Sequence, residues 1–240
     1  MKLEKQIVGK FEKRYKRFFA DSILENGELV VSHCPNSGSM KSLMDLENLT
    51  YMTFNDDPKR KLKYTLNVMK LENGAFACVN TSLPNKIVYD AIVNGEIPEI
   101  KDFDTILREV KYGEENSRID ILCEKGGEKI FIEVKNVTLI EKDSPGIAMF
   151  PDAVTDRGAK HLRELAKEVE KGNRAVMFYL VNRTDAESFA VAEHIDKKYK
   201  AEFDKAKAAG VEILVYKSKI SISGEDNNCE VDIEIDKRLN

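Results

Sequence analysis

The stretches Arg118-Ile-Asp-Ile-Leu-Cys and Ile130-Phe-Ile-Glu-Val-Lys decide the fold of the second half of this chain. Aliphatic residues recur at every second position in both, and a period of two is typical of β-strands. The spacer between them, Glu124-Lys-Gly-Gly-Glu, has paired glycines that suit a tight reversal. We therefore predict a hairpin that places Asp120 beside Glu133 and Lys135 on one face of a sheet. The other face should hold the aliphatic residues against a core: Ile119, Ile121, Ile130, Ile132 and Val134.

Two carboxylates and one amine on a shared sheet surface suit metal-assisted hydrolysis of a phosphodiester. Neighbouring carboxylates repel each other unless a cation lies between them, and hard oxygen ligands favour Mg²⁺ or Mn²⁺ over Zn²⁺. Such an ion polarises a phosphate and activates a water molecule, while Lys135 orients that water or stabilises developing negative charge. Glu109 and Glu115 precede the hairpin and are further candidate ligands, and Arg118 shares the face of Asp120 as a candidate nucleic-acid contact.

The same pattern has a plainer interpretation. Glu-x-Lys is common on exposed strand faces, where cross-strand ion pairs stabilise a sheet by only about 0.2 to 1 kcal/mol. The spacing alone favours such a solvated face. The convergence of several acids on one lysine favours a site, so both interpretations stay open at this point.

Residues 155–169 have the pattern of a helix whose polar side borders the predicted site. Thr155 is a suitable N-cap, and Asp156 lies in the first turn, where the helix dipole favours negative charge. An apolar stripe runs through Leu162, Leu165, Ala166 and Val169. The other side carries, at spacings of three and four, Arg157, Lys160, His161 and Glu164. A basic edge beside an acidic metal centre suits a phosphate, so the three basic residues of this side are predicted nucleic-acid contacts.

The first segment of the chain is basic although the formal net charge is -4. Lys10-Phe-Glu-Lys-Arg-Tyr-Lys-Arg-Phe-Phe-Ala interleaves cations with aromatic rings, a composition that suits phosphates and unpaired bases. The nucleic-acid-binding candidates here are Lys10, Lys13, Arg14, Tyr15, Lys16 and Arg17. For Phe11, Phe18 and Phe19 we favour burial in the core of a barrel over stacking on bases.

Turn signals divide the chain into two parts. Strand patterns cover residues 17–23, 29–34, 49–54, 64–70 and 75–79, which fits a five-stranded OB-like β-barrel in a domain of residues 1–82. A helix is expected over residues 85–93, followed by a strand near 108–112, the hairpin, the helix described above, and strand, helix and strand up to residue 216. This order predicts a mixed sheet flanked by helices over residues 83–240, and hence a mixed α/β protein.

Composition indicates a cytoplasmic protein with no membrane span. No apolar run of eighteen residues exists, and the N-terminus lacks the apolar segment of a signal peptide. Cys34, Cys78, Cys123 and Cys229 are widely spaced, so we expect buried, reduced thiols. A Walker loop, a Rossmann glycine pattern and a nucleophile elbow are all absent from the sequence, which argues against nucleotide hydrolysis, dinucleotide redox chemistry and serine hydrolase chemistry.

Several runs resemble the sugar fermentation stimulation protein A family. They are His33-Cys-Pro-Asn-Ser-Gly-Ser-Met, Asn80-Thr-Ser-Leu-Pro-Asn, Tyr112-Gly, Ser117-Arg-Ile-Asp, Ile132-Glu-Val-Lys-Asn-Val-Thr-Leu, Phe150-Pro-Asp-Ala, Arg157-Gly-Ala-Lys-His-Leu-Arg-Glu-Leu and Gly210-Val-Glu-Ile-Leu. The resemblance implies a DNA-binding protein linked to regulation of sugar metabolism, with an OB-like N-terminal part and a PD-(D/E)xK nuclease-like C-terminal part. It implies that Asp120 and Glu133 are the acids of that motif and Lys135 its lysine. Ile119 stands where the motif's name has proline, and either Glu109 or Glu115 is the upstream glutamate.

Three functional hypotheses follow. The first is a DNA-binding protein whose second domain is a Mg²⁺- or Mn²⁺-dependent nuclease. The second is a DNA-binding transcriptional regulator that keeps the nuclease-like fold without turnover. The third is a binder of a small anionic metabolite. DNA, including single-stranded DNA because of the aromatic residues, is the expected partner, and the oligomeric state is not predicted.

Overall fold

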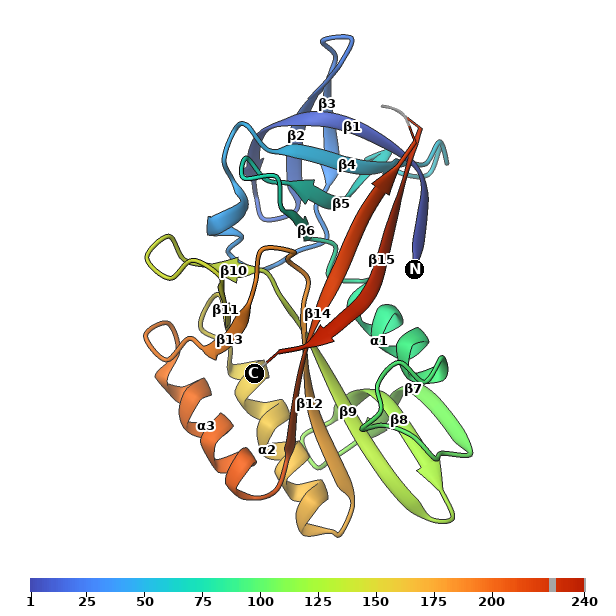
Figure 1. The fold of residues 1–240 in the computed structure, drawn as a ribbon, viewed down its shortest axis with the longest axis vertical. Helices are drawn as coiled ribbons and strands as arrows, with labels where there is room; N and C mark the ends of the chain where they lie inside the picture. The colour runs from blue at the N-terminus through green and yellow to red at the C-terminus, as the bar shows by residue number, and fades with distance from the viewer. Residues whose placement is uncertain (225–227, 240) are drawn as a thin grey trace.

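The computed structural model describes residues 1–224 and 228–239, and it shows curved strands above a sheet that is flanked by helices (Figure 1). The first part contains β1 (Lys2–Tyr15), β2 (Phe19–Leu24), β3 (Leu29–His33), the 3-10 turn η1 (Lys41–Leu43), β4 (Leu49–Phe54), β5 (Tyr64–Lys70) and β6 (Phe76–Cys78). The second part contains α1 (Pro84–Val93), β7 (Thr105–Tyr112), β8 (Ser117–Lys125), β9 (Glu128–Val137), β10 (Leu139–Ile140), β11 (Ile147–Phe150), α2 (Asp156–Glu170), β12 (Arg174–Val181), β13 (Ser188–Val191), α3 (Lys197–Ala208), β14 (Glu212–Ser223) and β15 (Cys229–Arg238).

The N-terminal strands curl around their own core. β1 pairs with β2 and β4, β2 pairs with β3, and β5 pairs with β4, all antiparallel. Phe11, Met52, Leu66 and Met69 fill the interior. The parallel joint between β3 and β5 has only the pairs Ser32↔Tyr64 and His33↔Thr65. This is the predicted OB-like arrangement, although the short joint leaves the barrel incompletely closed.

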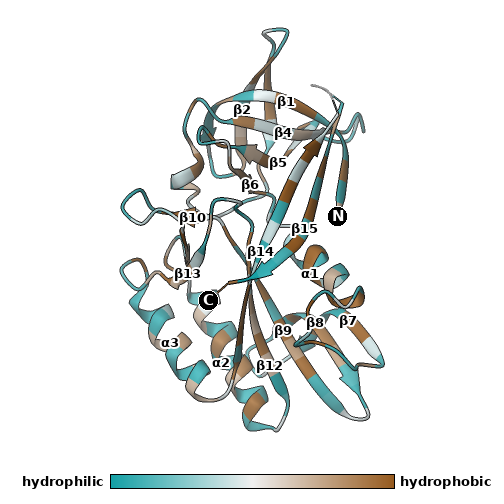
Figure 2. Cartoon of the chain, viewed as in Figure 1, coloured by the Kyte–Doolittle hydropathy of each residue, from teal (hydrophilic) through white to brown (hydrophobic). Residues whose placement is uncertain are grey.

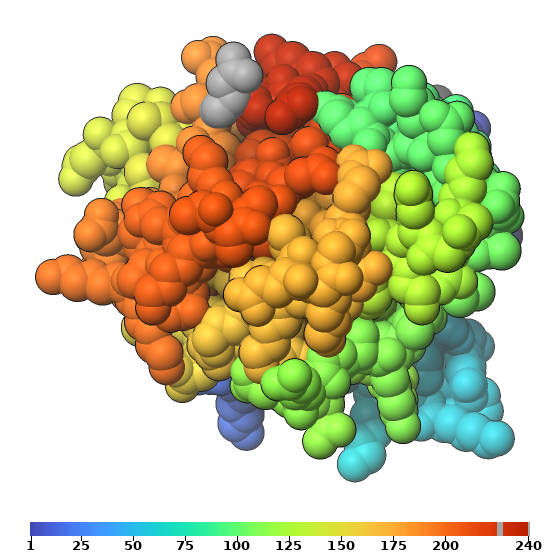
Figure 3. Space-filling view, turned by 90° about the horizontal axis from the view of Figure 1, so that it is seen from below, coloured from blue at the N-terminus to red at the C-terminus, as the bar shows by residue number. Residues whose placement is uncertain are grey.

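The second part is built on a mixed sheet in which β9 and β12 are central. β9 pairs antiparallel with β8 and parallel with β12, and β12 pairs parallel with β14. The run Ala175-Val-Met-Phe-Tyr-Leu-Val of β12 is buried throughout, as expected for a parallel strand that is covered on both faces. α1 covers one face, and α2 and α3, which lie side by side in Figure 3, cover the other. The predicted mixed α/β class is therefore confirmed.

The sequence pattern explains how α2 and α3 begin. In Figure 2 the helices alternate between hydrophilic and hydrophobic colours, as expected for elements with one buried side. The Thr155 side chain accepts a hydrogen bond from Gly158 N at 3.0 Å and so caps α2. Asp196 caps α3 by accepting from Tyr199 N at 2.9 Å, and its second oxygen accepts from Thr155 N at 2.9 Å. One carboxylate therefore fixes the starts of both helices.

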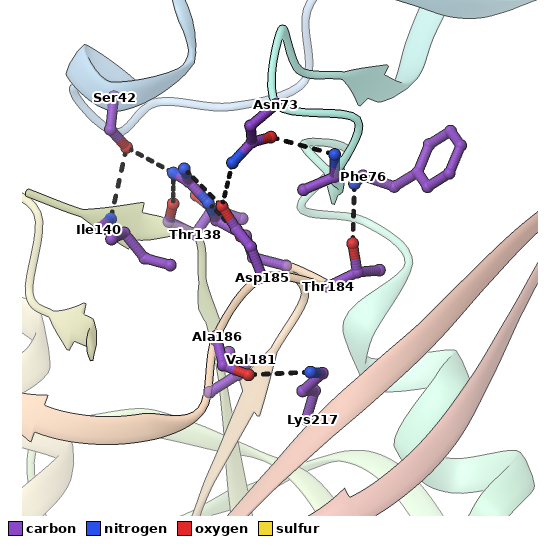
Figure 4. Close-up of polar contacts among 12 residues, drawn as sticks. Ser42, Asn73, Phe76, Thr138, Ile140, Val181, Thr184, Asp185, Ala186 and Lys217 are labelled. Atoms are coloured by element: carbon purple, nitrogen blue, oxygen red, sulfur yellow. Dashed lines mark hydrogen bonds and ion pairs between the residues drawn. The ribbon is translucent and has the colours of Figure 1, made fainter. Parts of the chain in front are cut away.

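The two parts share a continuous sheet. β1 pairs with β15 as well as with the barrel, for example through Leu3↔Val231, and β15 continues into β14. A second joint is the segment after β12, drawn in Figure 4. Thr184 and Phe76 exchange hydrogen bonds, and Asn73 Nδ2 donates to Asp185. The division at residue 82 stays a prediction, because sheet and side chains both cross it.

Arg183 is the centre of that second joint. Its guanidinium binds both carboxylate oxygens of Asp185, at 2.8 and 3.2 Å. It also donates to Ser42 Oγ at 3.0 Å and to Thr138 O at 3.2 Å. Its side chain is only 8% exposed. Arg183 therefore joins η1 of the first part to the segments that follow β9 and β12 in the second.

Two details differ from the sequence-based prediction. Residues 2–15 form a long strand that the pattern does not mark, so Phe11 is a core residue of β1, whereas Phe18 lies in the following turn and is 45% exposed. Ile119 and Ile121 do not share a core, since Ile119 packs under α2 and Ile121 packs on the α1 side. The alternation of β8 is interrupted at Asp120, where the side chain accepts from Val134 N and where the facing residue of β7, Glu109, has a left-handed φ of 54°.

The sequence pattern also did not predict three short strands and the C-terminal strand: β10, β11, β13 and β15. All four cysteines are buried, as predicted. Within residues 1–224 and 228–239, no helix combines the length and the apolar character that a membrane crossing requires.

We expect Arg183→Ala to lower the free energy of unfolding by about 2 to 4 kcal/mol, because the truncation leaves Asp185, Ser42 and the Thr138 carbonyl without their buried partner. Urea denaturation followed by circular dichroism measures the change. The control is Arg238→Ala, which removes an ion pair to Glu99 from a half-exposed arginine and should cost less than about 1 kcal/mol. Equal losses in the two variants contradict the assignment of Arg183 as the joint.

Candidate functional site

A cleft of about 430 Å³ lies where the two parts of the molecule meet. The first part contributes the loop residues Asn36, Ser37 and Gly38. The second part contributes the start of α1, the middle of β8 and β9, and the segment 149–157 that leads into α2. Asp120, Glu133 and Lys135 all line this cleft, so the predicted set converges on a cavity.

Asp120 sits at the point where β8 leaves β9. The register between these strands runs from Lys125↔Glu128 to Ile121↔Ile132 and ends there. Beyond it, Val134 N donates to Asp120 Oδ2 at 2.7 Å, so a side-chain oxygen takes the place of a backbone carbonyl. Asn85 Nδ2, from α1, donates to Oδ1 at 2.7 Å. These two bonds fix the carboxylate at the cleft.

Glu133 is a buried carboxylate, with a side chain that is 2% exposed. Lys135 Nζ donates to its Oε1 at 2.5 Å, and His161 Nδ1 makes a short contact with the same oxygen. Oε2 is buried and has no hydrogen-bond partner among the residues that the structure describes. The solvated-face interpretation of Glu-x-Lys is therefore wrong here, because α2 covers this face of the sheet.

The surroundings of His161 determine its tautomer. Arg157 Nε lies 3.4 Å from His161 Nε2, and an arginine N–H is always a donor. Nε2 is then an acceptor, and the ring proton lies on Nδ1, where it is donated to Glu133, so the Lys135 ammonium, 3.2 Å from the same Nδ1, makes no hydrogen bond to the ring. Burial lowers the pKa of His161, although its hydrogen bond to Glu133 opposes the shift, and a neutral ring agrees with this tautomer. The imidazole thus orients Glu133 and carries no charge.

The two carboxylates titrate in opposite directions. Burial, followed by repulsion from Glu133, raises the pKa of Asp120 to about 6. Burial acts in the same sense on Glu133, but the Lys135 ammonium and the His161 hydrogen bond outweigh it, so the pKa of Glu133 lies below its usual value. At neutral pH both groups are anionic and close together, an arrangement that a divalent cation stabilises.

The donor set suits a hard cation that keeps part of its water shell. Among residues 1–224 and 228–239, no group of three His, Cys, Asp or Glu side chains is arranged to hold an ion. Two carboxylates are present, and one of their oxygens, Glu133 Oε2, is buried without a partner. Mg²⁺ is often bound by one or two carboxylates together with water and phosphate oxygens. Asp120 and Glu133 therefore fit Mg²⁺ or Mn²⁺ as its protein ligands.

Other acids and bases from the sequence prediction lie outside this cleft. Glu109 is exposed in β7, and the Glu115 carboxylate lies 3.5 Å from Arg163. Arg118 lines a separate hollow with Lys111 and Asn116. Lys160 is partly exposed and donates to the backbone oxygen of Glu115.

Arg157 lines the cleft and His161 lies directly behind it, so α2 contributes to the site as expected.

The predicted nucleic-acid contacts of the basic N-terminal segment lie in three different settings. The Arg14 guanidinium donates to the backbone oxygens of Asn36, Gly38 and Ser39, at 2.7, 3.0 and 3.2 Å, so it holds the loop that lines the cleft. Lys10 pairs with Glu47 at 3.2 Å on the surface. The remaining residues gather around the β1–β2 turn: Lys13, Tyr15, Lys16 and Arg17.

Sequence reasoning missed several residues that build the cleft. Asn85 orients Asp120, and Asp152 accepts from Ser39 N at 2.7 Å, which closes the cleft wall from the other side. Asn136 Oδ1 accepts from Asn182 Nδ2 at 2.6 Å below the cleft. A signal existed, since Asn36, Asn85 and Asp152 all lie in the runs that carry the family resemblance. Their partners, however, are far away along the chain.

Comparison with known proteins places the chain in one family. The sequence profile described as "Sugar fermentation stimulation protein RE domain" matches residues 82–224, and "SfsA N-terminal OB domain" matches residues 13–79. A sugar fermentation stimulation protein homolog of Marinomonas sp. (strain MWYL1) is 49% identical over 215 residues, which cover 89% of this chain and 82% of the relative. The homolog of Pelagibacter ubique (strain HTCC1062) is 45% identical over 233 residues, 97% of this chain and 95% of the relative.

A solved structure agrees with these relatives. The structure of Pyrococcus furiosus SfsA in complex with Ca²⁺ has a TM-score of 0.83 and 26% sequence identity, and the match covers 100% of this chain and 96% of that one. The fold and the site define a two-part protein, an OB domain followed by a mixed α/β domain with two acids and a lysine in the cleft between them. The chain belongs to the sugar fermentation stimulation protein family, SfsA. The resemblance that the sequence motifs indicated is confirmed.

We expect Asp120→Asn in the metal-free protein to be more stable relative to the wild type at pH 7 than near pH 4, a difference added to the pH-independent loss of one of the two hydrogen bonds that the carboxylate accepts. The folded-state pKa of Asp120, about 6, is higher than its ordinary value of 3.8. The folded protein therefore holds this proton more tightly than the unfolded chain does, and the associated stability is lost as the pH rises through about 6. An asparagine cannot ionise, so the variant escapes the loss, which is at most about 3 kcal/mol.

Urea unfolding in EDTA at pH 4 and pH 7 measures this difference. Asp156→Asn is the matched control, because Lys198 lowers the pKa of that exposed carboxyl, and the control should change stability in the opposite direction. If the free energies of unfolding of Asp120→Asn and of the wild type differ by the same amount at both pH values, the raised pKa of Asp120 is contradicted.

Proposed function

We propose that this protein binds DNA and hydrolyses its phosphodiester backbone with a Mg²⁺ or Mn²⁺ ion held by Asp120 and Glu133. The convergence of these two acids and Lys135 on a cleft walled by the OB domain carries the proposal. OB-folds commonly bind oligonucleotides. The presence of Ca²⁺, another hard divalent cation, in the Pyrococcus furiosus SfsA structure supports the choice of metal.

The charged and polar residues around the two acids each have a role in this proposal. The bound ion would polarise the scissile phosphate and lower the pKa of a water molecule. Asn85 and the Val134 N–H hold Asp120 in place, and His161 holds Glu133. The Lys135 ammonium uses one of its donors on Glu133 and keeps the others for the water or the phosphate. Arg157, at the edge of the cleft, supplies a second positive charge for the DNA backbone.

Two alternatives remain distinct from this proposal. A DNA-binding regulator without turnover fits the OB domain and the link to sugar fermentation that the family name carries. Retention of both acids and the lysine favours chemistry over this alternative. A small anionic metabolite fits Lys135 and Arg157, but it gives the OB domain no part. A cytoplasmic location, where DNA and Mg²⁺ are both available, belongs to the same proposal.

We expect one Mn²⁺ ion to bind the wild type and the affinity to fall at least about tenfold in Asp120→Asn and in Glu133→Gln, because each removes a charged ligand. Isothermal titration calorimetry gives the affinity, and Glu128→Gln, at the far end of β9, is the control that should bind normally. The same titration of Glu109→Gln and Glu115→Gln decides whether an upstream glutamate joins the site. Unchanged affinity in both cleft variants rules out this metal site.

We expect Lys135→Ala to lose at least about a hundredfold in the rate of DNA cleavage while DNA affinity changes little, because the ammonium acts on the developing charge and not on docking. Cleavage of labelled single- and double-stranded DNA with Mg²⁺, Mn²⁺ or EDTA measures the rate. Lys129→Ala removes an exposed lysine from the same strand and should cleave normally. Tight binding without cleavage by the wild type favours the regulator.

A further inference from the structure

The turn between β1 and β2 has an unusual backbone. Lys16 and Arg17 both have left-handed φ angles, 47° and 64°, although neither is a glycine. Non-glycine residues rarely adopt this conformation, and it concentrates at functional sites. In this turn the conformation is followed at once by Phe18, the exposed aromatic residue at the tip. A large apolar ring, 45% exposed, thus directly follows a strained turn.

Phe18 extends a row of rings across three neighbouring strands. Tyr15 of β1 pairs in register with Phe19 of β2, and Phe19 pairs with His33 of β3. Directly opposite residues point to the same face of a sheet, so these three rings share one face. Tyr15 and Phe19 stack with centroids 5.4 Å apart, and Phe18 lies 6.4 Å from His33. Each of the three rings in the row is partly exposed.

Positive charge surrounds this row of rings. Lys13 Nζ lies 5.6 Å from the centre of the Tyr15 ring and 3.5 Å from Asp21. Lys16 and Arg17 are exposed, and within the described part of the chain their side chains form no ion pair. The surface therefore combines flat rings with unneutralised cations, which complement the bases and the phosphates of a nucleic acid.

The turn that carries these rings is tied by hydrogen bonds to the loop that lines the cleft. Arg14, one residue before Tyr15, binds the backbone oxygens of Asn36 and Gly38, and both of these residues line the cleft. Cys34 N donates to Phe18 O at 2.8 Å, so the turn is tied to the strand that leads into the same loop. The rings therefore have a fixed position relative to the loop that lines the cleft, although Arg14 and Tyr15, as neighbours in β1, point to opposite faces of the sheet.

We propose that Tyr15, Phe18, Phe19 and His33 bind an unpaired stretch of DNA. The substrate is then DNA with a single-stranded segment, and not a blunt duplex. Base faces are covered by their neighbours in a duplex and are free to stack on a protein ring only in an unpaired strand. This inference rests on the proposed function, since it names the form of DNA that the protein binds.

The test compares Phe18→Ala with the wild type for binding of a labelled oligothymidine and of a blunt duplex, by fluorescence anisotropy in EDTA. We expect the loss of one stacked base to weaken single-strand binding about 5- to 150-fold and duplex binding less than about twofold. Phe54→Ala, which removes another exposed ring of the OB domain, is the matched control and should bind both ligands normally. Phe18→Tyr keeps a flat ring and should restore single-strand binding.

Arg17→Gly separates binding from folding. Glycine adopts the left-handed conformation without strain, so this variant should melt no lower than the wild type yet bind the single strand more weakly. An unchanged single-strand affinity in Phe18→Ala, or an equal loss for duplex and single strand, overturns the inference. Failure of the proposed hydrolysis looks different, because single-strand binding then still depends on Phe18 while no metal-dependent cleavage occurs.

Discussion

A carboxylate that is 2% exposed must be paired, and the pairing of Glu133 is the interaction on which the second half of this protein depends. Lys135 comes from the same strand, two residues on, and His161 comes from α2. The contact with His161 therefore fixes the position of the helix over the sheet at the same time as it fixes the acid. Burial under α2 turns a common surface pattern into a site with a defined charge.

The position of Asp120 follows from a break in regular structure. A backbone N–H that would extend the β8–β9 ladder is given to its side chain, and Asn85 of α1 holds the second oxygen. The acid is thereby kept beside Glu133 against their mutual repulsion, which is one reason for its raised pKa. The repulsion between the two acids lowers the stability of the fold at the place where a cation is proposed to bind, as is common at functional sites.

The cleft exists only because the two parts of the chain are locked together. Arg14 and Asp152 hold opposite sides of the loop at residues 36–39, one through its carbonyl oxygens and the other through an N–H. Arg183 holds η1 to the central sheet, and β1 continues that sheet through β15. The OB domain is in this way a wall of the cleft, and its ring-bearing turn has a fixed position relative to the acids.

The sequence by itself determined the hairpin, the faces of β9, the capped helix α2 and the OB-like strand pattern, because each depends on neighbours within a few residues and on periods of two or 3.6. Only the tertiary structure decided which acids meet, since Asp120, Asn85 and Glu133 come from three elements, and it placed Glu109 and Glu115 outside the cleft. It also gave Arg14 a structural role and left Phe18 in solvent. These outcomes depend on contacts between distant segments, which local periodicity does not encode.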